Sequence, residues 1–406
     1  MQGIVSVCVG GESTHYKTVQ TYLPERNIVT RDYTQGPLVV GLLEGLCNIK
    51  TDDDGPSVTE SYAREAGYNG SYVLGTNVFS KELLSVVTRG DDPRFSDFVD
   101  SVFQALFLAE YRNISAEDFP QTNVFGEDFV DMYTHALSVA GNYGDIYKSS
   151  FDLFLERFSM NYVNNGTTGL MWSHPFGIIS NSRDVQKYPL SPTMNAVLRR
   201  GVLRCGIRLE RPGFAAKSNA SSLHYTGMEI DYCRAMAASL FRGYSSAVEF
   251  IELPNIETGY AWLVSGDLDV LTGASRTLQA EVQEPSTGHG FAFSIPYFYG
   301  YSEQEDNLCL ATVEDHDWAA FVYWIVTATV YAEEEGISKS TSNRMPEVYV
   351  YGRELKRMFR DSILFVGNYG DIYNRNVQDF IPRSGRNMLN KGPHLTPQHY
   401  IMPGFL

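Results

Sequence analysis

The chain has 406 residues and a formal net charge of -16, and 13% of its residues are aromatic. This acidity argues against nucleic acid and anionic membrane surfaces as partners, because both attract basic proteins. The length favours two or three domains, and the aromatic content indicates packed globular structure.

The first part of the chain is predicted to be a small α/β unit. Strands are indicated at 3–9, 27–33 and 47–51, and helices at 13–22 and 36–46 between them. This alternation is typical of a parallel sheet covered by helices. The first eight residues lack a basic segment followed by a long apolar one, so we do not expect a precursor that still carries its signal peptide.

The middle of the chain contains one copy of a repeated segment. Gly141–Tyr147, with the sequence GNYGDIY, recurs unchanged as Gly367–Tyr373. The likeness extends over about 90 residues, from about 91 to 180 and again from about 314 to 402. We therefore interpret one stretch of the chain as a copy of the other.

The second half repeats the strand and helix pattern. The predicted strands are Val202–Ile207, Val248–Leu253 and Leu268–Thr272, and the predicted helices are Glu229–Phe241 and 257–265. Ligands of parallel sheets bind at the carboxyl ends of strands and at helix N-termini. The loops 10–14, 52–55, 212–225 and 272–277 are therefore the places to expect a site.

The most apolar stretch, Trp318–Ala332, is predicted to be a buried helix. It contains no charged residue but is shorter than the roughly 20 residues that a membrane span needs. The matching stretch of the other copy carries Asp97 and Asp100, as a half-exposed helix of a globular protein does. We expect no membrane span.

The five cysteines suggest an oxidising compartment. Cys8 and Cys47 lie at the edges of predicted strands that are neighbours, and Cys205 closes a strand shortly before Cys233 on a helix. This predicts two disulfides and leaves Cys309 unpaired. Five buried thiols are the alternative. Four glycosylation sequons, at Asn69, Asn113, Asn165 and Asn219, are compatible with secretion, although such tripeptides also occur by chance.

No catalytic pattern is present. The sequence contains no nucleophile elbow, phosphate-binding loop, dinucleotide fingerprint or HExxH motif, and its eight histidines have no metal-ligand spacing. We therefore expect no cofactor, no metal and no enzyme activity. The residue types at the predicted strand ends suit recognition of a small polar ligand instead.

Several of these segments resemble bacterial periplasmic amino-acid-binding proteins, the extracellular solute-binding protein family 3, and among them the general L-amino-acid type. The segments similar to the first lobe are 201–207, 212–214, 227–235 and 265–271, and those similar to the second lobe are 7–14 and 45–53. Both copies of the repeat resemble the C-terminal tail of the family. The resemblance implies an α/β fold of type II periplasmic-binding-protein-like lobes, with parallel-rich sheets flanked by helices.

The order of these parts departs from the family. The resemblance implies a body like lobe 2 at 1–85, a first tail at 86–190, a body like lobe 1 at 191–302 and a second tail at 303–406. The family runs from lobe 1 through lobe 2 to one tail. This chain therefore has a rearranged order and a spare tail.

The resemblance also implies a ligand site, with one part missing. Phe214 matches the aromatic that packs on the ligand, Ser13 and Thr14 match the polar helix start of lobe 2, and Asp53 matches the carboxylate that receives the ligand's ammonium. The family's carboxylate-binding arginine belongs in a Thr-x-x-Arg pattern, but Ala280 follows Thr277-Leu278-Gln279 here. Further candidate ligand residues in the same loop are Thr272, Arg276 and Thr277, with Arg276 as a substitute anchor.

Two functions follow from this comparison. The first is a secreted solute-binding protein, extracellular or periplasmic, that holds an amino acid weakly between its lobes. The second is an assembly protein whose ligand site has decayed and which associates with itself, as a filament, through its lobes and spare tail. The apolar face of the first tail, which includes Phe98 and Val102, must then be covered by the rest of the chain or by a neighbouring molecule.

Overall fold

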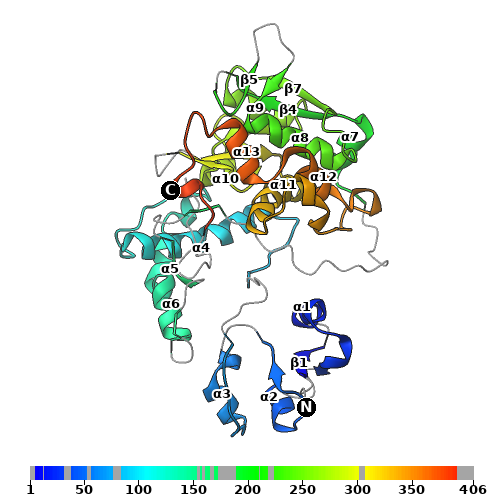
Figure 1. The fold of residues 1–406 in the computed structure, drawn as a ribbon. Helices are drawn as coiled ribbons and strands as arrows, with labels where there is room; N and C mark the ends of the chain where they lie inside the picture. Colours follow the sequence, from blue (N-terminus) through cyan, green and yellow to red (C-terminus); the bar gives the residue numbers. More distant parts are fainter. Residues whose placement is uncertain are drawn as a thin grey trace. The chain divides into compact units, whose positions relative to one another are not determined.

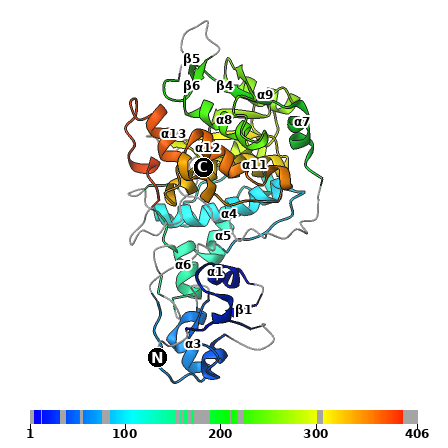
Figure 2. The same cartoon turned by 45° about the vertical axis from the view of Figure 1, so that its right-hand side comes forward.

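The computed structural model describes residues 5–11, 13–31, 38–52, 56–75, 84–152, 156–157, 161–164, 169–171, 189–209, 211–217, 224–300 and 307–390 (Figures 1 and 2). These residues form two compact units. The first comprises the described residues of 1–85 and 146–157, and the second comprises those of 86–145 and 158–390.

The first unit is built on a three-stranded parallel sheet. Its strands are β1 (Val7–Gly10), β2 (Ile28–Arg31) and β3 (Ile49–Lys50), in the order β2-β1-β3, and its helices are α1 (Thr14–Tyr22), α2 (Val39–Leu43) and α3 (Glu60–Glu65), with short 3-10 turns at Glu25–Asn27 and Pro56–Val58. The three predicted strands and the two predicted helices are present with different ends, and the predicted positions 3–4, 32–33 and 36–37 lie outside the described residues. Side-chain hydrogen bonds from Ser13 and Thr59 begin α1 and α3.

A disulfide joins Cys8 to Cys47 in this unit. The sequence had suggested that Cys8 lies at the end of its strand. In the structure Cys8 lies inside β1 and is fully buried. Helix α2 passes close to the bond at Gly41, where an added Cβ would lie 2.4 Å from the Cys8 sulfur. A glycine is therefore required at this point of α2, because any side chain would collide with the disulfide.

The second unit contains a six-stranded mixed sheet. Its strands are β4 (Leu203–Ile207), β7 (Val248–Glu252), β8 (Val270–Ala274), β9 (Ala292–Phe293), β10 (Phe298–Tyr299) and β11 (Asn307–Thr312), in the order β10-β11-β8-β4-β7, with β9 also paired to β11. A separate hairpin joins β5 (Ala216–Lys217) to β6 (Tyr225–Thr226). Strand β4 runs parallel to both β7 and β8, while β11 is antiparallel to β8. The predicted α/β class with parallel-rich sheets is confirmed.

The helices of this unit are α4 (Pro93–Arg112), α5 (Met132–Ala140), α6 (Tyr143–Ser150), α7 (Pro192–Arg200), α8 (Met228–Leu240), α9 (Ile256–Ser265), α10 (Leu278–Gln283), α11 (His316–Glu334), α12 (Met358–Val366) and α13 (Tyr369–Asn376). The last residues of α6 belong to the first unit. Helices α8, α9 and α11 pack directly on strands of the sheet. Helix α8 packs on β4, on α11 and on α12, so it is buried almost all round. A second disulfide, Cys205–Cys233, ties α8 to β4, whereas Cys309 is unpaired and buried. Cys205 lies inside its strand and not at the end.

The two repeated segments have the same local structure. A long helix, a 3-10 turn and two short helices occur in this order as α4, Glu127–Phe129, α5 and α6, and again as α11, Arg353–Leu355, α12 and α13. The second segment has a further 3-10 helix, Lys339–Arg344, after α11. Gly141 and Gly367 end the first short helix with φ of +75° and +87°. The N–H groups of Asp145 and Asp371 then donate to the preceding asparagine side chains, at 3.0 and 2.9 Å, which starts the next helix.

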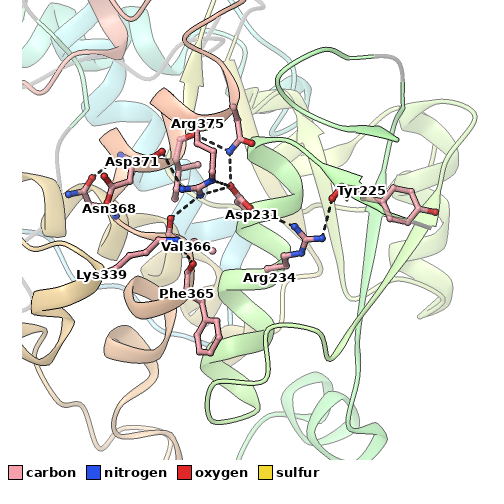
Figure 3. Close-up of polar contacts among 11 residues, drawn as sticks. Tyr225, Asp231, Arg234, Lys339, Phe365, Val366, Asn368, Asp371 and Arg375 are labelled. Atoms are coloured by element: carbon pink, nitrogen blue, oxygen red, sulfur yellow. Dashed lines mark hydrogen bonds and ion pairs between the residues drawn. The ribbon is translucent and has the colours of Figure 1, made fainter. Parts of the chain in front are cut away.

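The second copy is fixed to α8 by a buried carboxylate. Asp231, which is 8% exposed, accepts hydrogen bonds from Arg375 at 2.6 Å and from Asn376 at 2.6 Å (Figure 3). Arg375 also donates to the carbonyl oxygen of Val366, which joins α12 to α13. The first copy has serine at both matching positions, 149 and 150, so it lacks the groups that make this contact.

The first copy packs elsewhere in the same unit. Helix α4 lies against α10, and the Arg276 guanidinium is 3.8 Å from the Asp100 carboxylate. The Phe98 ring contacts Phe125 and Phe129 with centroid distances of 5.2 and 5.5 Å. Part of the cover for the apolar face of α4 therefore comes from this chain itself.

The α4–α10 contact is expected to weaken as the pH rises. Burial, and after it the neighbouring Glu281 and Glu314 carboxylates, raise the pKa of Asp97 to about 8. This folded-state pKa exceeds the unfolded value of about 3.9. The contribution of Asp97 to the free energy of unfolding is therefore most favourable below pH 4, and it is lost as the pH rises towards 8. Asp97→Asn removes this titration, so its stability relative to the native chain should increase from pH 5 to pH 8.

Urea unfolding of the two proteins at both pH values is the measurement. The exposed Asp128→Asn substitution in the same unit serves as the control and should follow the native chain at each pH. Identical pH profiles for the native chain and Asp97→Asn would contradict the expectation.

Candidate functional site

Polar and aromatic side chains gather where β4 and β8 end. The two strands are parallel neighbours, so their carboxyl ends lie at the same edge of the sheet. Arg208, Arg211 and Phe214 follow β4, Thr272 and Gly273 lie near the end of β8, Glu229 comes from the first turn of α8, and Tyr297 precedes β10. We call these seven residues the strand-end cluster.

Glu229 is the centre of the strand-end cluster. Its carboxylate is fully buried and accepts hydrogen bonds from Arg211 at 2.7 Å, from the Thr272 hydroxyl at 2.9 Å and from the Tyr297 hydroxyl at 3.0 Å. Burial and the nearby Glu229 carboxylate raise the pKa of Tyr297 well above its usual value, so its hydroxyl remains a donor. A buried charge with one cation and two further donors is well compensated. Glu229 therefore holds the cluster together.

Backbone contacts fix the loop that carries Arg211 and Phe214. The first turn of α8 begins at Gly227, and the N–H groups of Met228 and Glu229 donate to carbonyl oxygens of this loop at 2.9 and 3.0 Å. A Cβ on Gly227 would lie 2.0 Å from the Phe214 carbonyl oxygen, and the φ of Gly227 is +129°. The approach of the loop to the helix thus depends on a glycine at this position.

Among the described residues, one hydrogen bond holds the side chain of Arg208. Its Nη2 donates to the carbonyl oxygen of Gly273 at 2.8 Å. Its Nε is buried and has no acceptor among the residues that the structure describes. Burial lowers the pKa of Arg208, and the neighbouring Arg211 cation lowers it further. The cluster therefore contains an arginine whose donors are largely unused.

The structure brings two of the four predicted residues of this unit into the cluster. Phe214 is buried, with its ring 4.9 Å from the Phe298 ring and 5.2 Å from the Arg211 guanidinium carbon. Thr272 is buried and bonded to Glu229. Arg276 and Thr277 have other contacts: Arg276 bonds Glu281 at 2.5 Å and faces Asp100, and the Thr277 hydroxyl accepts from the first turn of α10.

The remaining predicted ligand residues belong to the first unit. The Ser13 hydroxyl donates to the Gly10 carbonyl oxygen at 2.6 Å and accepts from Tyr16 N–H at 3.2 Å, so it is a helix cap. Thr14 is the first residue of α1. Asp53 lies outside the described residues. Lys50, at the end of β3, contacts Asp52 and the Ser57 carbonyl oxygen.

Two of the four sequons lie within the described residues. Asn69 and Asn113 are exposed, and Asn113 ends α4 in the left-handed conformation with φ of +51°. Asn165 and Asn219 lie outside the described residues.

Sequence reasoning did not find Arg208, Arg211, Glu229 or Tyr297. A signal for the two arginines was available, because Arg208 and Arg211 come directly after a strand that is apolar and buried. No sequence signal showed that Glu229 and Tyr297 would meet them, since that depends on how α8 and the segment before β10 pack.

The described residues hold no cluster of three histidine, cysteine, aspartate or glutamate side chains that suits a metal ion. Within the same residues, no helix combines the length and the apolar character that crossing a membrane requires.

No protein-family model matches the chain. Over 109 residues the chain is 29% identical to YhdW of Escherichia coli (strain K12), which is named as an amino-acid ABC transporter-binding protein. That match covers 27% of this chain and 30% of YhdW, so the chain spans less than a third of the length of this curated relative.

Solved structures of binding proteins are also similar to parts of the chain. An ABC transporter or periplasmic binding protein from Brucella ovis with glutathione bound is 19% identical with a TM-score of 0.39, and the match covers 47% of this chain and 92% of that one. The cysteine-binding protein from Campylobacter jejuni is 20% identical with a TM-score of 0.21, and the match covers 26% and 38%. The chain is thus similar, over part of its length, to an amino-acid transporter-binding protein.

Proposed function

We propose that this chain is a secreted, non-enzymatic solute-binding protein that holds a small polar ligand of the amino-acid type between its two lobes. The observation that carries the proposal is the strand-end cluster. In open α/β sheets ligands bind outside the carboxyl ends of the strands, and this cluster places cations, hydroxyls and an aromatic ring there. The name of the partial relative YhdW supports the same ligand class.

The proposed lobe 1 body at 191–302 contains Phe214 and the arginines. The proposed lobe 2 body at 1–85 contains Ser13, Thr14 and Asp53, and we propose that Asp53 receives the ammonium group of the ligand. The proposed tails are 86–190 and 303–406, of which the second is bound to α8 through Asp231.

The proposed compartment is extracellular or periplasmic. Cys8–Cys47 and Cys205–Cys233 are structural disulfides, which persist in oxidising compartments and are rare in the cytosol. Glycosylation of Asn69 and Asn113 fits a secreted chain, since both are exposed.

Catalysis is not part of the proposal. A hydrolytic or lyase site needs a nucleophile or a general base that can reach the substrate. In the strand-end cluster the only carboxylate, Glu229, is buried and already accepts three hydrogen bonds. Its arrangement suits positioning of the arginines rather than proton transfer.

No contact among the described residues supports assembly through a spare tail. Helix α4 of the first copy packs against α10 of the same chain, and Phe98 packs against Phe125 and Phe129. Serines replace the two residues that would let this copy bind an α8 helix of another molecule.

Calorimetry of the purified chain with a panel of the twenty amino acids tests the proposed function. We expect binding in the high micromolar range, because loss of the Thr-x-x-Arg anchor removes a few kcal/mol from an otherwise intact site. A panel in which no amino acid binds would overturn the proposal.

A further inference from the structure

The charges of the strand-end cluster do not balance. Arg211 is neutralised by Glu229, whose carboxylate is already bonded by Thr272 and Tyr297. Arg208 bonds only a carbonyl oxygen within the described residues. The cluster therefore carries a second guanidinium charge that no carboxylate contacts.

The unused donors of Arg208 indicate what is missing. A guanidinium carries five N–H donors, and among the described residues Arg208 uses one of them. Its buried Nε has no acceptor, and leaving a buried donor of a charged group unpaired is unfavourable. A planar acceptor with two oxygens matches a guanidinium best, because it accepts two parallel N–H bonds. That acceptor is a carboxylate.

Arg208 is also held in place for such a ligand. Its Nη2 is tied to Gly273 of β8, and Gly273 N–H donates in turn to the Tyr297 hydroxyl at 2.9 Å. Gly273 has a φ of +69°, and a Cβ there would lie 2.2 Å from Arg211 Nη1. A side chain at this position would therefore displace the arginines.

We propose that Arg208 binds the carboxylate of the ligand, as a weaker anchor than the arginine that is absent from the Thr-x-x-Arg pattern, because one of its donors is already bonded to Gly273. The inference rests on the proposed function and names the anchoring residue and the ligand class, which is a small carboxylate anion such as the α-carboxylate of an amino acid. Arg276 has a different role, because its guanidinium is bonded to Glu281 and faces Asp100.

Calorimetry with the most tightly bound amino acid of the panel tests the assignment. Arg208→Gln should weaken binding about 10- to 100-fold, because a charge-assisted fork is lost, and Arg208→Lys should recover only part of it. Arg242→Gln, at an exposed arginine of the same unit, is the matched control. Unchanged affinity in Arg208→Gln, or a larger loss in Arg276→Gln, would overturn the assignment.

A second measurement separates this inference from the proposed function. The Nε–H resonance of Arg208, assigned by its absence from the Arg208→Lys spectrum, should shift and saturate when acetate is added to the native chain. A panel in which no amino acid binds would overturn the proposed function, yet a saturable acetate shift would still support Arg208 as a carboxylate site. No saturable shift would overturn the Arg208 assignment.

Discussion

Replacing Asp231 with alanine is expected to destabilise the second unit by about 3 kcal/mol, because it leaves Arg375 beside α8 without its carboxylate. Asp231 is 8% exposed and accepts bonds from both Arg375 and Asn376 (Figure 3). We place the effect at the low end for a broken buried ion pair, since the Arg375 side chain is 40% exposed. Urea unfolding followed by circular dichroism gives the free energy.

An exposed ion pair between the same two parts of the chain provides the control. Arg242 follows α8 and pairs with Glu354, and their side chains are 67% and 71% exposed. Glu354→Ala should cost less than about 1 kcal/mol, as exposed pairs do. Equal effects of the two substitutions would mean that Asp231 does not fix α13 to α8.

Removal of the Cys205–Cys233 disulfide is expected to have a similar or larger effect. The bond closes a loop with a sequence separation of 28, and the loop-entropy model assigns about 3.5 kcal/mol to such a constraint. The double variant Cys205→Ala, Cys233→Ala should therefore unfold at a markedly lower urea concentration than the native chain, and reducing agent should have little further effect on its second unit.

Cys309→Ala separates the disulfide from the loss of a buried sulfur. Cys309 is fully buried in β11 of the same sheet and closes no loop. Its replacement should cost much less than the double variant does. If the two variants were equally destabilised, packing of sulfur in the sheet would explain the effect and the loop constraint would not.

The approximate positions of helices and strands were predicted better from the sequence than the residues at which they begin and end. Strands β4, β7 and β8 and helices α8 and α9 lie within two residues of their predicted positions, because buried apolar runs and helical periodicity are local signals. Strand β11 was not predicted, since its antiparallel place beside β8 is a long-range property. Helix α2 is shorter than predicted, and its close approach to a disulfide at Gly41 could not be read from periodicity.

The site was predicted less well, for a physical reason. Phe214 was found through the family resemblance, and Thr272 because it lies at the end of a predicted strand. Arg211 and Tyr297 lie 18 and 68 residues from Glu229 in the chain. Their contacts with Glu229 therefore depend on how three separate segments pack. Arg276 was a reasonable candidate because it follows β8. Its guanidinium is paired with Glu281 of the nearby helix α10, so its charge is neutralised without a ligand.

The repeated GNYGDIY segment has a consequence for the order of folding. The reciprocal bonds of its corner, between the asparagine and the aspartate that start the second helix, span four residues in each copy, although Asn368 also donates to the distant Ile337 carbonyl oxygen. Contacts this local close in well under a microsecond, long before strands far apart in the chain can pair. We therefore expect each corner to act as an early folding nucleus.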